Sequence, residues 1–309
     1  MFLPFFLFAM WSSCFALGKA ALVYSTPLFF TATRMLIASL IIIGYLFIKK
    51  RSDLKVSKKE LFSILILAIF SMYLTNALEF YGLKHLSAAK TSFIYSLTPF
   101  FAALFSYIHF KEKMSKKKML GMLIGFFGIV PVFFINTGSE SFFKSIFIIS
   151  TPELAVIGAT LFSVYGWVLL RLLVKNNTLS PLTVNGLSMF LGGIFALVHS
   201  YYIDTWLPTP IASGGHFQFM KSIVVITLIS NIICYNLYGY LLKKYTATFM
   251  SFIGLLSPVF ASFSEWLILK TPPNPIILLS STVVILGLWV VYQEELKQGY
   301  ILKNKKEAA

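Results

Sequence analysis

Ten apolar runs, each about as long as a bilayer is thick, follow one another along the chain and are separated by short polar stretches. A helix of about 20 apolar residues crosses the hydrocarbon core, which is about 30 Å thick. The runs lack the period-two alternation of a membrane β-barrel, so they predict a bundle of transmembrane helices. The predicted spans are residues 2–22, 27–48, 60–83, 87–110, 117–136, 153–174, 180–200, 219–242, 246–269 and 275–293.

The composition narrows the class of protein further. Hydrophobic residues make up 58% of the 309 residues and charged residues 12%, with a mean hydropathy of +0.81. Because an average soluble domain carries about 25% charged residues, a soluble enzyme, a disordered chain and a nucleic-acid-binding domain are excluded. Cys14 and Cys234 lie inside apolar runs and imply no disulfide framework. The first run lacks a basic leader, so we expect no cleavable signal peptide.

The 26 lysines and arginines are distributed unevenly among the loops. Alternate loops and the C-terminal tail hold 19 of them, whereas the intervening loops hold 4. Basic residues concentrate on the cytoplasmic side of membrane proteins. We therefore expect both termini in the cytoplasm, in the cytoplasmic (inner) membrane of a bacterium. The net charge of +15 then reflects topology, and nucleic acid is not an expected partner.

An internal repeat runs through the chain. Residues 88–111 match residues 247–270 at an offset of 159, with Pro99 over Pro258 among nine identical pairs. A weaker match, at an offset of 154, aligns Pro27 with Pro181. Each copy holds five helices, an odd number, so the second copy enters the membrane upside down. Inverted repeats are typical of secondary transporters, which bind substrate near the membrane midplane between the halves.

The predicted fold class is thus an all-α membrane protein with ten transmembrane helices in two inverted five-helix repeats. Rocking of one half against the other would open a central cavity to each side in turn. The expected organisation is a first repeat over residues 1–136, an external linker over 137–152, a second repeat over 153–293 and a basic cytoplasmic tail over 294–309.

Short motifs in both copies resemble those of the EamA-type drug/metabolite transporters. The motifs are Ala88-Ala89-Lys90-Thr91-Ser92, Leu97-Thr98-Pro99, Phe110-Lys111-Glu112-Lys113, Gly121 and Gly128 in the first copy, and Ala247-Thr248, Leu256-Ser257-Pro258 and Gly287 in the second. The resemblance covers nearly the whole chain. It implies ten helices, a central cavity and exchange or proton-coupled movement of small metabolites. One departure is Thr271, where the family often has an acidic residue equivalent to Glu112.

The resemblance leads us to expect a secondary active transporter of amino acids or amino-acid-bearing metabolites, working by alternating access across the lipid bilayer. One alternative is an S-adenosylmethionine/S-adenosylhomocysteine-type exchanger of an intracellular bacterium, which the Lys-, Ile- and Phe-rich composition suits. A further alternative is a regulatory or lipid-modifying membrane protein. The sequence has no Walker A motif, nucleophile elbow or metal-ligand spacing, so we expect no enzyme, cofactor or metal.

Ionisable residues inside a span are costly and are therefore candidates for function. Glu79 and Lys90 flank the turn between the third and fourth spans. We expect them to form an ion pair, either as a snorkelling interfacial salt bridge or as part of a substrate or proton site. Arg34 either anchors a substrate carboxylate or pairs with a carbonyl group or Glu79. Glu265 faces the cavity or the headgroups, and Glu79 and Glu265 are the candidates for proton coupling.

Polar and aromatic residues of several spans complete the expected substrate cavity. Asn76 shares a helix face with Glu79, and Asn231 shares one with Tyr235. Such a set suits a zwitterion or a planar ring, with cation–π contact, although each residue is also compatible with ordinary packing. The candidates are Trp11, Arg34, Asn76, Glu79, Tyr95, Trp167, Asn231 and Tyr235.

Two further features concern helix packing and bending. Gly121, Gly125 and Gly128 form a stripe of small residues in the fifth span, and Gly287 matches Gly128 in the second copy. This stripe indicates close helix packing, either within the bundle or at the face of a homodimer. Pro99 and Pro258 lie in the middle of their spans and are expected to kink them at matching places.

Overall fold

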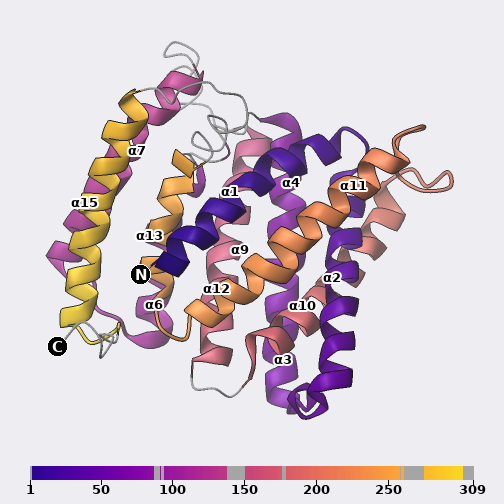
Figure 1. Cartoon of the computed structure of the whole chain (residues 1–309), viewed down its shortest axis with the longest axis horizontal. Coiled ribbons are helices and arrows are strands. Elements are labelled where there is room, and N and C mark those ends of the chain that lie inside the picture. The colour runs from indigo at the N-terminus through magenta and orange to yellow at the C-terminus, as the bar shows by residue number, and fades with distance from the viewer. Residues whose placement is uncertain are drawn as a thin grey trace.

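Apolar runs of the predicted length form helices in the computed structural model (Figure 1). The structure describes residues 2–86, 91, 94–137, 150–175, 179–257, 259–260 and 275–301. In this part of the chain the β-structure amounts to one isolated bridge, between Ser25 and Ile211. The protein is therefore all-helical, as predicted, while the count of ten spans and their inverted arrangement stay predictions.

The helices follow the order of the apolar runs. The first set is α1 (Phe2–Leu22), α2 (Pro27–Lys49), the 3₁₀ helix η1 (Arg51–Leu54), α3 (Lys58–Leu67), the π-helical η2 (Ala68–Leu74) and α4 (Thr75–His85). The second set is α6 (Thr98–Phe110), α7 (Lys116–Thr137), α9 (Thr151–Val174) and α10 (Pro181–Ile203). The third set is α11 (His216–Ile226), the π-helical η3 (Thr227–Cys234), α12 (Tyr235–Leu241), α13 (Ala247–Ile253), the 3₁₀ helix η4 (Gly254–Leu256) and α15 (Pro275–Lys297).

Six helical stretches of the described residues are long and apolar enough to cross a membrane. They are α2, the continuous stretch α3–η2–α4, α9, α10, the continuous stretch α11–η3–α12, and α15. Local signals set where helices begin. The Ser57 hydroxyl accepts a hydrogen bond from the Glu60 backbone N–H, and the Glu60 carboxylate accepts one from the Ser57 N–H, which together cap α3. Pro27 and Pro181 stand in the first turns of α2 and α10, where a missing N–H costs little.

The helices pack in a regular set of pairs. The closest associations are α7 with α15 and α2 with α10, and α6 packs on α13. Each of these pairs joins helices that occupy corresponding places in the two predicted repeats. Two further pairs, α4 with α9 and α1 with α11, are related by the repeat, because each joins the third helix of one predicted half to the first helix of the other. Figure 1 shows α7 and α15 side by side at one edge of the bundle.

Glycines allow α7 and α15 to approach closely. A Cβ added to Gly121 would lie 2.9 Å from the Gly287 carbonyl oxygen, and one added to Gly287 would lie 2.6 Å from the Gly121 carbonyl oxygen. The ring of Phe252 occupies the space beside Gly125, and Val283 the space beside Gly128. The three glycines of the predicted stripe, together with Gly287, thus lie in contacts inside the bundle.

Two long stretches are interrupted by π-helical segments at matching places. The segments η2 and η3 begin at Ala68 and Thr227, which are separated by the 159-residue offset of the repeat. After η2, the Asn76 side-chain amide donates to the carbonyls of residues 71 and 72, both at 3.0 Å. After η3, the Asn236 amide donates to the carbonyls of residues 231 and 232, at 3.4 and 2.8 Å. Both asparagines therefore satisfy backbone oxygens that the π-helical turn displaces.

The fourth helix of each predicted repeat is also discontinuous. A turn at Ser96 and Leu97 precedes α6, so Pro99 stands in the first turn of α6 and not in mid-helix as expected. A proline at that place begins a helix without breaking a hydrogen bond, which is why no kink inside a continuous helix results. The 3₁₀ helix η4 follows α13 at the corresponding place. Pro258 lies outside the described residues.

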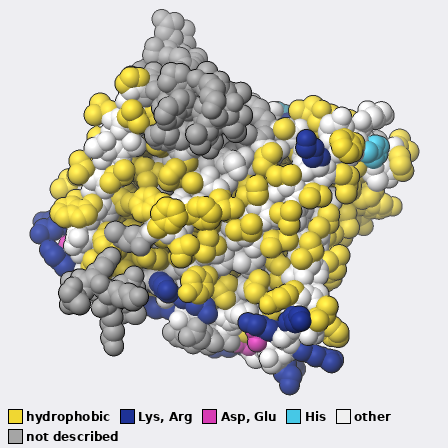
Figure 2. All heavy atoms as spheres, viewed as in Figure 1, with side chains coloured by type: hydrophobic (Ala, Val, Ile, Leu, Met, Phe, Trp, Pro, Cys, Tyr) yellow, Lys and Arg dark blue, Asp and Glu magenta, His cyan; other side chains and the backbone are white. Residues whose placement is uncertain are grey.

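Charged groups at one end of the bundle are buried as ion pairs. Figure 2 shows most Lys and Arg side chains along this edge, below a face covered by hydrophobic atoms. Arg171 Nη1 lies 2.6 Å from Glu112 Oε1, and Lys118 Nζ lies 2.6 Å from Glu295 Oε1. By sequence, Arg171 and Lys118 lie at the loop ends of their spans, but both side chains are buried. Their burial is tolerated because each charge is paired with a carboxylate.

Candidate functional site

A cavity opens in the middle of the bundle, and its empty volume is about 1170 Å³ with its mouth included. Its walls come from both predicted repeats. The candidates that line it are Trp11, Arg34, Asn76, Glu79, Tyr95, Trp167 and Tyr235. The eighth candidate, Asn231, is fully buried and reaches the cavity through Arg34.

One wall of the cavity is aromatic. Trp11 of α1 packs against Trp167 of α9 and Tyr235 of α12, with ring centroids 5.6 and 5.3 Å apart. Tyr238 lies 4.2 Å from Trp167 and 5.7 Å from Trp11, and Phe8 borders both Trp11 and Tyr238. These rings line the cavity together, so they offer a surface for stacking a planar group or holding a cation over a ring face.

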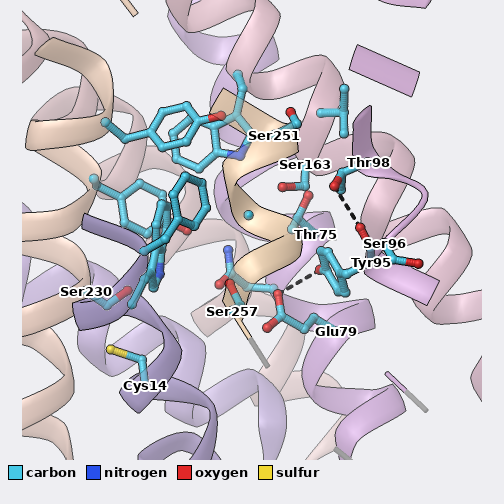
Figure 3. A pocket seen from close by; sticks show the side chains of 18 of the residues that line it. Cys14, Thr75, Glu79, Tyr95, Ser96, Thr98, Ser163, Ser230, Ser251 and Ser257 are labelled. Atoms are coloured by element: carbon cyan, nitrogen blue, oxygen red, sulfur yellow. Dashed lines mark hydrogen bonds between the residues drawn. The ribbon is translucent and has the colours of Figure 1, made fainter. Parts of the chain in front are cut away.

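The acidic group of the cavity is Glu79 of α4. The Tyr95 hydroxyl donates a hydrogen bond to Glu79 Oε2 at 2.8 Å (Figure 3). Lys90, the expected ion-pair partner, lies outside the described residues, as does Glu265. Tyr95 itself precedes the turn at Ser96 and Leu97, so the interruption before α6 places this phenol at the cavity.

The basic group of the cavity is Arg34 of α2, which is 3% exposed. The guanidinium donates through Nη2 to Asn76 Oδ1 and through Nη1 to Asn231 Oδ1, the latter at 3.4 Å. Its Cζ lies 5.0 Å from the centre of the Phe80 ring and 5.6 Å from that of Phe30. The sequence predicts a carbonyl group or Glu79 as the structural partner, and the structure shows two side-chain carbonyl oxygens, both of asparagine amides. Asn76 reaches Arg34 because its own amide nitrogen is fixed at the end of η2.

Several lining residues were not among the candidates. Tyr238 could have been chosen, because it follows Tyr235 by three residues and so shares its helix face. Small hydroxyl side chains give no comparable signal, because serine and threonine are common in packed membrane helices. The hydroxyl residues of the lining are Thr75, Ser96, Thr98, Ser163, Ser230, Ser251 and Ser257 (Figure 3).

The arrangement can bind a molecule that carries opposite charges and a flat or cationic portion. Among the described lining residues, Arg34 and Glu79 are the charged ones, with one charge of each sign. A ligand carboxylate suits the planar guanidinium, and a ligand ammonium suits the carboxylate. The aromatic wall accepts the remaining part of such a ligand.

Comparisons with known proteins give one consistent family. The profile described as the EamA-like transporter family matches residues 1–134 and 150–293. The chain is 37% identical over 306 residues to an S-adenosylmethionine/S-adenosylhomocysteine transporter of Chlamydia trachomatis serovar D, covering 99% of this chain and 92% of that protein. It is 38% identical over 306 residues to a protein of the same description from Chlamydia muridarum, covering 99% of this chain and 95% of that one.

A solved crystal structure has the same fold. It superposes on this chain with a TM-score of 0.73 and covers 94% of this chain and 95% of its own. The two sequences are 15% identical. At that level of identity the likeness concerns the fold alone.

Proposed function

Because the chain belongs to the EamA-like transporter family, we propose that it exchanges S-adenosylmethionine and S-adenosylhomocysteine across a bacterial inner membrane. The resemblance read from the motifs at Ala88–Lys113 and Ala247–Gly287 is confirmed by the family match. The protein is a transporter and not an enzyme.

The observation that carries the choice of substrate is the similarity to named transporters. Three chlamydial relatives, 37–38% identical over 306 residues, share one description, and the match covers nearly the full length of each chain. Of the substrates expected from the sequence, this similarity favours the S-adenosylmethionine type, which was the alternative, over free amino acids, which were the main expectation.

The chemistry of the cavity is compatible with this substrate class. S-adenosylmethionine carries a planar purine, a sulfonium cation and a zwitterionic amino-acid end. The aromatic wall of Trp11, Trp167, Tyr235 and Tyr238 offers a surface for the purine or the sulfonium. Glu79 and Arg34 offer the two charges that complement a zwitterion. A free amino acid would use the charged pair and leave most of the aromatic wall without a partner.

The proposed mechanism is alternating access between two inverted halves of a ten-span bundle, with both termini in the cytoplasm. The matching positions of η2 and η3 and the corresponding helix pairs support two related halves. Discontinuous helices at a central cavity are typical of secondary transporters. Glu79 is the proposed proton-coupling group among the described residues. The linker, the tail and a homodimer remain predictions.

Counterflow in liposomes tests the proposal. Purified protein would be reconstituted in vesicles loaded with one unlabelled solute, and uptake of labelled solute would be followed. The panel contains S-adenosylmethionine, S-adenosylhomocysteine, aromatic, aliphatic and cationic amino acids, a sugar and a nucleoside. Saturable exchange of the first two is expected. Exchange of amino acids alone would support the main expectation from the sequence, and flux without saturation would indicate a channel. If the folded protein exchanged none of these solutes, the result would favour a helix bundle that does not transport.

A further inference from the structure

Arg34 holds a buried positive charge whose hydrogen-bond partners among the described residues are neutral, while Glu79 is a further charged member of the same cavity lining. Its guanidinium meets two amide oxygens, of Asn76 and Asn231, and the faces of two phenylalanine rings. Its Nε is buried and has no hydrogen-bond partner among the described residues. Among the described residues, no carboxylate oxygen lies within 4.0 Å of the guanidinium, whereas Arg171 and Lys118 each have one.

A charge in this setting is costly. Moving a guanidinium out of water loses solvation that only good hydrogen bonds or an opposite charge restore. Amide dipoles and ring faces compensate in part. The side chain is also a member of the cavity lining. Among the described residues, the cavity lining therefore contains a cation that no carboxylate pairs directly.

We propose that Arg34 binds the carboxylate of the substrate's amino-acid end and so makes that carboxylate a requirement for recognition. The inference rests on the proposed function, whose substrates both carry this group. A planar guanidinium binds a carboxylate through two parallel hydrogen bonds, which lysine cannot reproduce. Glu79, held by Tyr95, is the matching group for the substrate ammonium.

The asparagines give this contact a further consequence. Asn231 lies within η3, and Asn76 is the second residue of α4, just after η2. Arg34 thus contacts one asparagine from each predicted half. The contact to Asn231, at 3.4 Å, is the longer of the two and is the one that an incoming carboxylate displaces. Substrate binding therefore exchanges a contact between the halves for a contact to the substrate.

The first test is a comparison of two ligands on the wild-type protein. S-adenosylhomocysteine and its carboxamide have the same shape and the same ammonium, and the carboxamide lacks the negative charge. Equilibrium binding of each would be measured by competition with labelled S-adenosylhomocysteine on detergent-purified protein. We expect the carboxamide to bind about 100-fold more weakly. Equal affinities would overturn the inference.

The second test assigns that difference to Arg34. In Arg34→Gln the affinity for S-adenosylhomocysteine should fall about 100-fold, while the affinity for the carboxamide should change little, so that the two become nearly equal. Arg34→Lys should recover only part of the difference. A difference that persists in Arg34→Gln would overturn the assignment. If Arg34→Gln does not fold, the ligand comparison on the wild type and the Asn231 variants described below decide whether Arg34 binds the carboxylate.

The third test supplies an internal competitor. Asn231→Asp places a carboxylate beside Arg34 Nη1 and should weaken S-adenosylhomocysteine binding at least about tenfold. Asn231→Ala removes the amide without adding a charge and should weaken binding by a clearly smaller factor than Asn231→Asp. Asn236→Asp adds the same charge at a residue that has no contact with Arg34 in the described structure and is the matched control. Equal effects of Asn231→Asp and Asn231→Ala would contradict the proposal.

The outcomes separate this inference from the proposed function. Wild-type protein that neither binds nor exchanges S-adenosylmethionine and S-adenosylhomocysteine would overturn both. Wild-type protein that exchanges them but binds the carboxamide equally well would overturn the role of Arg34 alone. Exchange together with a carboxylate requirement that Arg34→Gln removes is the expected result.

Discussion

Buried charges are treated differently in two regions of this molecule. At the basic end, Glu112 faces Arg171 and Lys118 faces Glu295, each pair at 2.6 Å. The second pair is extended by Thr246, whose hydroxyl donates to Glu295 Oε2 at 2.5 Å. In the central cavity, by contrast, Arg34 meets only amides and rings among the described residues.

This difference in partners indicates which buried charges stabilise the fold and which are available to bind a ligand. A buried charge that is paired is already neutralised by its partner, and removing one member of the pair leaves the other as an uncompensated charge in an apolar interior. A buried charge with neutral partners can still bind an opposite charge on a ligand. In the proposed two-half arrangement, both ion pairs also join the halves, because Glu112 and Lys118 precede the linker and Arg171 and Glu295 follow it. Opening at that end must then separate them.

The largest effect is expected from Glu79→Gln, which alters the acidic side of the cavity. The substitution removes the negative charge that faces the substrate ammonium or carries a proton, so exchange should fall at least about 100-fold. Folding should change little, because glutamine has the same shape. Exchange in liposomes and thermal unfolding in detergent would be measured together, with Glu60→Gln, at a carboxylate outside the cavity lining, as control. Full activity would remove Glu79 from the mechanism.

At the paired end, the expected loss is of stability. Glu112→Ala leaves the Arg171 guanidinium buried without a carboxylate and should lower the free energy of unfolding by about 3–5 kcal/mol. Denaturant unfolding in detergent micelles measures it. Replacing both residues, as in Glu112→Leu with Arg171→Met, should cost less than Glu112→Ala alone. Arg51→Ala, at an exposed arginine that lies over the Phe47 ring, is the control. A loss below about 1 kcal/mol for Glu112→Ala would mean that the pair does not hold this end.

The sequence predicts the charged residues of the central cavity better than the buried ion pairs at the basic end. Ionisable residues inside apolar runs are rare, so Arg34 and Glu79 stand out as site residues in the sequence alone. Arg171 and Lys118 lie at the ends of runs, where the sequence gives the same signal for a solvated charge and for a buried one. The carboxylates that pair with them come from distant parts of the chain, and composition does not reveal such pairing.

The fold shows the same division. The lengths of the apolar runs predicted the helices, because the thickness of a bilayer imposes those lengths. The interruptions at η2, η3 and η4 were not predicted, because one extra residue in a helical turn leaves the average hydrophobicity unchanged. The two π-helical segments begin 159 residues apart, which is the offset of the repeat, but the sequence does not show that either span is interrupted. The position of Pro99 in mid-span predicts a kink, whereas the structure places this proline in the first turn of α6.

A smaller loss of stability is expected where α7 and α15 continue the contact that begins at the Lys118–Glu295 pair. Gly287→Ala introduces a methyl group 2.6 Å from the Gly121 carbonyl oxygen, so the helices must separate, at a cost of about 1–3 kcal/mol. Gly44→Ala is the matched control, because nothing lies within 4 Å of an added Cβ there. Unfolding of both variants would be compared under one set of conditions. Equal stability of Gly287→Ala and Gly44→Ala would show that α7 and α15 can separate at this contact at little cost. The Lys118–Glu295 pair would then be the main contact that stabilises this end.

The smallest effect is expected from Tyr95→Phe, which removes one hydrogen bond from Glu79 and leaves its charge in place. The phenol donates to Oε2 at 2.8 Å and so fixes the direction in which the carboxylate points. Without it, the carboxylate should bind the substrate ammonium with poorer alignment, and affinity should fall about 3- to 10-fold. Tyr165→Phe, at a tyrosine outside the described cavity lining, is the control. Tighter binding in Tyr95→Phe would mean that the phenol competes with the substrate for Glu79. Both charges of the cavity would then be held by neutral groups that the substrate displaces, Glu79 by Tyr95 as Arg34 by Asn231.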